Sequence, residues 1–103
     1  MEHAHKKLYC QVVATLIIAD AAITDAERSF LERLMDRFGF SKEERAAVIN
    51  SVNIGDDVQE KVMALPTGVR AELLQELEAV AAVDEHIDAR EARIIETVRA
   101  ALA

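Results

Sequence analysis

The chain has 103 residues, enough for one domain with a single modest core. Hydrophobic residues make up 51% of it, and only 3 Gly and 1 Pro interrupt it, which favours a globular and mostly helical protein over a disordered one. The formal net charge of -7 repels the phosphates of nucleic acids and anionic membrane surfaces, so neither is expected as a direct partner. The expected fold class is all-α, with residues 1–103 forming one domain.

Cys10 is the only cysteine, which excludes an intrachain disulfide and a cysteine-based zinc site. We expect it to act as a small buried or half-buried hydrophobic residue. No segment approaches the roughly 18 apolar residues that a membrane span requires, so no direct membrane insertion is expected. The N-terminal stretch also lacks a clear small-residue cleavage site for a signal peptidase. A soluble, cytoplasmic protein is the expectation.

The first predicted helix runs to about Asp20, because its apolar residues recur with helical spacing. Thr24 and Glu27 have the spacing of a capping box, which predicts that a second helix begins here with Glu27 at its third position. Gly39 is expected to end that helix. The predicted inward residues are Leu8, Tyr9, Val12, Val13, Leu16 and Ile17 in the first helix, and Phe30, Leu31, Leu34, Met35 and Phe38 in the second.

Four more helices follow. Ser41 and Glu44 form another capping box, and the helix after it should turn Val48, Ile49 and Val52 inward. A short fourth helix is expected at about 57–64, before Pro66. Thr67 can cap a fifth helix, and the box from Asp88 to Glu91 caps a sixth that runs to the end. Met35 and Met63, with Phe30, Phe38 and Phe40, are interpreted as core filling.

An acidic box with the pattern Asp-x-x-Ile-x-x-x-Glu occurs twice, at Asp20–Glu27 and, 64 residues later, at Asp84–Glu91. Each box follows and precedes apolar residues at matching positions. The matching pairs are Val13 and Leu77, Leu16 and Val80, Phe30 and Ile94, Leu31 and Ile95, and Leu34 and Val98. This repetition predicts two equivalent helix–turn–helix corners in a bundle of about six helices.

The four carboxylates of the boxes are predicted to face the core. At 100° per residue, Asp20 lies within about 40° of Val13 and Leu16, and Glu27 within about 40° of Leu31 and Leu34. Asp84 and Glu91 hold the same relation to their own helices. Asp20 and Asp84 are also expected at helix C-termini, where the macrodipole disfavours an anion by roughly 0.3–1 kcal/mol. Backbone N–H groups, a basic side chain or a bound cation would have to compensate.

Two interpretations of these carboxylates are open. The first is structural, because capping boxes explain Glu27 and Glu91, and the next turn can donate hydrogen bonds to Asp20 and Asp84. The second is one divalent cation held by Asp20, Glu27, Asp84 and Glu91, provided that the corners face each other. An EF-hand is excluded, since apolar residues occupy the first ligand positions of its loop. His86 is interpreted as a solvent-facing loop residue, because the first box has Ala22 there.

The boxes and their surroundings resemble the TerB-like family, whose namesake belongs to bacterial tellurite-resistance operons. The resemblance covers about residues 8–102 and rests on Ala19-Asp20-Ala21-Ala22-Ile23-Thr24-Asp25-Ala26-Glu27, on Val83–Glu91 and on the stretch from Leu31 to Phe40. It implies an all-helical domain with pseudo-twofold character, acidic clusters suspected of binding metal, and a place in stress-response or envelope-linked assemblies. The chain departs from the family pattern where Ala21 and Glu85 replace glycines.

The expected function is therefore a non-enzymatic interaction module with an unidentified protein partner and a divalent cation as the candidate cofactor. No nucleophile with a neighbouring base and no glycine-rich phosphate loop is evident in the sequence. A carboxylate-rich, metal-dependent hydrolase is one alternative, although the Glu-x-x-His spacing common in such helical bundles is missing. A purely scaffolding homodimer is the other alternative.

Overall fold

The computed structural model describes residues 2–18, 25–52, 58–83 and 89–102. Within them the chain forms six helices and no strand, which confirms the all-α prediction. The helices are α1 (His3–Ile18), α2 (Asp25–Arg37), α3 (Lys42–Ser51), α4 (Gln59–Met63), α5 (Thr67–Val83) and α6 (Ala89–Ala100). None of these helices is long and apolar enough to cross a membrane.

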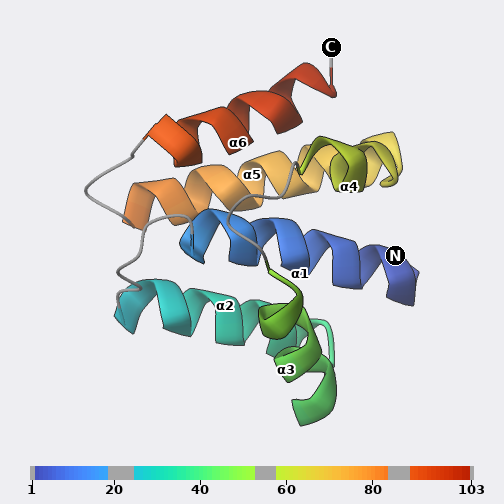
Figure 1. The fold of residues 1–103 in the computed structure, drawn as a ribbon, viewed down its shortest axis with the longest axis vertical. Helices are drawn as coiled ribbons and strands as arrows, with labels where there is room; N and C mark the ends of the chain where they lie inside the picture. Colours follow the sequence, from blue (N-terminus) through green and yellow to red (C-terminus); the bar gives the residue numbers. More distant parts are fainter. Residues whose placement is uncertain (1, 19–24, 53–57, 84–88, 103) are drawn as a thin grey trace.

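Helix α1 lies at the centre of the bundle, between α2 on one side and α5 and α6 on the other (Figure 1). It contacts each of the other five helices, which is why residues around its whole circumference are buried. Cys10 is fully enclosed, as the sequence predicts. The buried hydroxyl of Thr15 is satisfied within the helix, because it donates a hydrogen bond to the carbonyl of Gln11 at 2.7 Å.

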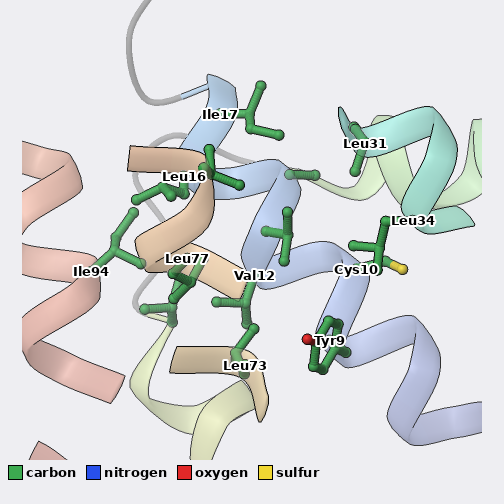
Figure 2. Packing of buried hydrophobic residues seen from close by; sticks show 14 of the residues in the cluster. Tyr9, Cys10, Val12, Leu16, Ile17, Leu31, Leu34, Leu73, Leu77 and Ile94 are labelled. Atoms are coloured by element: carbon green, nitrogen blue, oxygen red, sulfur yellow. The ribbon is translucent and has the colours of Figure 1, made fainter. Parts of the chain in front are cut away.

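The core is built mainly between α1 and its neighbours. Figure 2 shows Val12 and Leu16 of α1 beside Leu73 and Leu77 of α5, with Ile94 of α6 beyond them. Leu31 and Leu34 of α2 pack on the other side of α1, near Cys10. Burying such aliphatic side chains contributes about 1.5–3 kcal/mol each relative to leaving them exposed, so α1 acts as the shared hydrophobic partner of the bundle.

Helix α2 ends as the sequence predicts. Gly39 has a φ of +72°, the left-handed conformation that glycine adopts without steric cost. The amide of Phe40 donates to the carbonyl of Met35 at 3.1 Å, and the amide of Gly39 donates to that of Asp36 at 3.0 Å. This pair of hydrogen bonds is a Schellman motif. The capping box of Ser41 and Glu44 then starts α3, also as predicted.

The prediction of burial is wrong for two apolar residues. Ile49 is 44% exposed and Met63 is 53% exposed. Helix α3 packs on α1 through Val48 and Val52, which leaves Ile49 on its outer side. Helix α4 is only five residues long and buries Val62, so its neighbour Met63 points outward. The predicted cap is also shifted, because Thr67 is the first residue of α5 and not the residue before it.

The internal repeat seen in the sequence has a structural counterpart. Helices α1 and α5 begin at His3 and Thr67, and α2 and α6 begin at Asp25 and Ala89, so both pairs share the offset of 64 residues. Matched core positions are buried in both copies: Val13 and Leu77, Leu16 and Val80, Leu31 and Ile95, and Leu34 and Val98. The copies differ where α5 faces outward, since buried Val12 corresponds to Glu76, which is partly exposed.

Candidate functional site

The helix ends that flank the two predicted corners lie at the same end of the bundle. Figure 1 shows the C-terminal ends of α1 and α5 and the N-terminal ends of α2 and α6 along one edge of the molecule. Helices α1 and α5 lie between α2 and α6 in that view. Of the four predicted site residues, Asp20 and Asp84 lie outside the described residues, as does His86. The geometry of the candidate site therefore concerns Glu27 and Glu91.

Glu27 and Glu91 occupy equivalent positions, each as the third residue of its helix. Their exposed fractions are 2% and 1%, and they are the only buried charged side chains among the described residues. The predicted inward orientation of these two glutamates is confirmed. Neither glutamate lacks an interaction partner within the protein.

A comparison with Glu44 separates this burial from ordinary helix capping. Glu44 is also the third residue of its helix, and its side chain accepts a hydrogen bond from the Ser41 amide at 3.1 Å. That backbone hydrogen bond lowers the pKa of Glu44. The side chain nevertheless stays 27% exposed, with His3 beside it at 2.6 Å. A capping glutamate therefore does not need to be enclosed, and the burial of Glu27 and Glu91 has another origin.

Estimated free energies also indicate that capping alone does not explain the burial of Glu27 and Glu91. The position near a helix N-terminus stabilises a carboxylate by about 0.3–1 kcal/mol. Removing a charged carboxylate from water costs several kcal/mol even after the protein relaxes. The helix dipole therefore offsets only a small part of the cost at Glu27 and Glu91. Further hydrogen bonds, a cationic group or a bound cation must offset the rest.

Glu27 and Glu91 do not complete a metal site with other described residues. No group of three or more His, Cys, Asp or Glu side chains in residues 2–18, 25–52, 58–83 and 89–102 is placed to hold a metal ion. The predicted set of four carboxylates needs Asp20 and Asp84, which lie outside those ranges. The structure thus supplies two buried carboxylates of the predicted four, and the cation site stays a prediction.

A second polar cluster was not foreseen from the sequence. The hydroxyl of Tyr9 donates to Glu76 Oε1 at 3.1 Å and lies 3.2 Å from the carbonyl of Glu72. Arg37 Nη2 donates to the same Glu76 oxygen at 2.5 Å. Burial, and then the negative charge of Glu76, raise the pKa of Tyr9 well above its usual range. These residues come from α1, α2 and α5, and their separation in the chain leaves no local sequence signal.

The geometry can be set against known proteins. No protein family, curated protein or solved structure matches this chain.

Proposed function

We propose that this chain is a non-enzymatic, TerB-like interaction module that binds one divalent cation at its paired acidic corners. Its setting is a bacterial stress-response or envelope-linked system, in the cytoplasm, with a protein as its partner. The family assignment and this setting rest on the resemblance of the two acidic boxes. The cation site rests on the same boxes and on the burial of Glu27 and Glu91.

The observation that carries the proposal is the matched burial of Glu27 and Glu91 at equivalent places of a repeated motif. A repeat that preserved only capping would preserve the spacing of the residues and not the enclosure of their carboxylates, as Glu44 demonstrates. A cation shared by both corners supplies a reason for keeping two buried carboxylates. It would also compensate the cost of removing them from water.

The donor set indicates which cations would bind. Carboxylate oxygens are the preferred ligands of hard cations such as Ca²⁺, Mg²⁺ and Mn²⁺. Four carboxylates carry more negative charge than one divalent cation neutralises. Such a site would hold the cation tightly and would leave little reason for a further anionic ligand to bind it. The cation would then tie the two helix–turn–helix corners together and present a fixed surface to a partner.

Thermal unfolding tests this proposal when the metal-free protein is titrated with Ca²⁺, Mg²⁺, Mn²⁺ and Zn²⁺. A bound cation stabilises the folded state according to its concentration relative to its dissociation constant, by about 2.7 kcal/mol at one hundred times that constant. We expect a saturable increase in the melting temperature with at least one of the four ions. No change with any of them at millimolar concentration would rule the cation site out.

Glutamine variants separate a cation site from capping. Glu27→Gln and Glu91→Gln keep a side chain that can still serve in a capping box. They remove the charge that a cation requires. We expect both variants to lose the cation-dependent stabilisation, measured as the difference in melting temperature between saturating cation and EDTA. Glu32→Gln, at an exposed position of α2, is the matched control and should respond to the cation as the parent does.

The non-enzymatic part of the proposal has its own test. The cation-loaded protein would be incubated with p-nitrophenyl phosphate and p-nitrophenyl acetate, which report phosphate-ester and carboxylic-ester hydrolysis. We expect no turnover above that of the cation alone. Turnover that is lost in Glu27→Gln would favour the metal-dependent hydrolase instead.

A further inference from the structure

A polar hollow of about 430 Å³ lies between α1, α2 and α5, at the opposite end of α2 from Glu27. Its walls are Tyr9 of α1, Arg37 and Phe38 at the end of α2, and Glu72, Gln75 and Glu76 of α5. The volume falls within the range of small-ligand pockets. Neither the acidic boxes nor the proposed cation site uses any of these residues.

Hydrogen bonds among Tyr9, Arg37 and Glu76 fix the side chains at the base of the hollow. Glu76 is only 14% exposed, and one of its oxygens accepts hydrogen bonds from both Tyr9 and Arg37. The Phe38 ring packs edge-on against Tyr9, with ring centres 5.3 Å apart. These contacts link three helices, so the walls are fixed before any ligand arrives. A preformed site loses less conformational entropy on binding.

Part of the hollow remains available for a ligand. The side chains of Glu72 and Gln75 are exposed and form no hydrogen bond or ion pair with the residues that the structure describes. Arg37 is 61% exposed, and its guanidinium has further N–H groups beyond the one that reaches Glu76. The hollow thus offers a carboxylate, an amide and spare N–H donors beside an aromatic ring.

The net charge of the residues that line the hollow indicates which kind of ligand fits it. One guanidinium, that of Arg37, faces two carboxylates, those of Glu72 and Glu76, so the lining carries one net negative charge. The chain as a whole is also acidic, with a formal charge of -7, which attracts basic partners. From this balance we infer that the hollow binds a lysine or arginine side chain of a partner protein. The cationic group meets Glu72, and Arg37 and Gln75 donate to a backbone carbonyl of the partner.

This inference deepens the partner assignment of the proposed function but uses a different site, so the two can fail separately. Lys6 provides an internal check. Its ammonium lies 5.9 Å from the centre of the Phe38 ring, close to the hollow but outside its walls. A cation in the hollow would be repelled by Lys6 and attracted by Glu72. Removing the two charges must therefore change the affinity in opposite directions.

The experiment is an NMR titration of the ¹⁵N-labelled full chain in EDTA with N-acetyl-arginine amide. N-acetyl-citrulline amide, which has nearly the same shape and no charge, is the control ligand. We expect saturable shifts at Phe38, Glu72 and Gln75 with the arginine probe, and affinity at least about threefold weaker for citrulline. Equal affinity for the two probes, or no saturable shift, would overturn the inference.

Three variants complete the test. Glu72→Gln should weaken the arginine probe at least about threefold, whereas Lys6→Gln should strengthen it. Glu78→Gln, at another exposed position of α5 outside the hollow, should leave the affinity unchanged. All three positions are at least partly exposed, so the variants are expected to fold. Equal effects of Glu72→Gln and Glu78→Gln would mean a general effect of net charge and would contradict a site in the hollow.

Discussion

Glu27 and Glu91 are the third residues of two helices that begin 64 residues apart, and both side chains are almost completely buried. The same relation holds for the apolar residues around them, such as Leu34 and Val98. The two copies therefore match in sequence, in the positions at which their helices begin, and in the side chains that they bury. A carboxylate kept inside at both places is a costly feature, and it is the feature that a function of this molecule has to explain.

Gly39, in the turn after α2, and Gly68, in α5, should respond to replacement by alanine in opposite directions. Gly39→Ala is expected to destabilise the protein by about 1 kcal/mol, because φ is +72° there and an added Cβ meets no neighbour that could change the result. Gly68→Ala has equally open space and lies inside α5, so it should stabilise by about 0.5 kcal/mol. Urea unfolding of both variants measures these values. A Gly39→Ala variant as stable as the parent would contradict the left-handed turn.

Arg70 should contribute more to stability than an ordinary surface arginine. Its guanidinium donates to the carbonyls of Val62 and Met63, the last two residues of α4, and to that of Leu65 just after it. It also donates to the carbonyl of Ala101 after α6. Arg70→Lys cannot reproduce this fork of hydrogen bonds, and we expect a loss of about 2 kcal/mol in the free energy of unfolding. Arg93→Lys, at an exposed position of α6, is the control and should change it by less than about 0.5 kcal/mol.

Tyr9 should make the protein less stable at high pH. Burial and then Glu76 raise its pKa in the folded state, so the folded protein holds this proton more tightly than the unfolded chain, in which the pKa is about 10. Its contribution is complete below pH 10 and is lost as the pH rises above that value. Because Tyr9 is the only tyrosine, absorbance near 295 nm reports it directly. Ionisation of the folded protein at about pH 10 would contradict the buried cluster.

Cys10 should be chemically inert in the folded protein. The thiol is fully enclosed, and burial raises its pKa to about 12. Reaction with Ellman's reagent at pH 8 should be at least about a hundredfold slower than in guanidinium chloride, since the reactive thiolate is both scarce and inaccessible. Comparable rates in the two conditions would show that α1 is not the central helix.

Local rules predicted the helices and their ends well. The capping box of Ser41 and Glu44 and the stop at Gly39 depend on a few neighbouring residues, and both occur as predicted. Burial was less predictable where it depends on neighbours distant in sequence. Ile49 and Met63 have the apolar character of core residues, but both side chains are exposed among the described residues.

In the candidate site, too, local features could be predicted from the sequence and features that depend on distant residues could not. The inward orientation of Glu27 and Glu91 could be predicted, because helical spacing places them on the apolar face. The hollow around Tyr9 could not, because Tyr9 and Glu76 are 67 residues apart and meet only through the packing of α1 on α5. The same packing makes Glu76, the counterpart of buried Val12, a hydrogen-bonded wall of the hollow.

The most direct measurement of the cation site is anomalous X-ray scattering from a crystal of the protein soaked in Mn²⁺. We expect one Mn²⁺ per chain, bonded to carboxylate oxygens of both Glu27 and Glu91 at roughly 2.0–2.6 Å. This peak should disappear in Glu91→Gln. No ion at either glutamate, separate ions at the two glutamates, or Mn²⁺ only at exposed carboxylates would contradict a shared cation site.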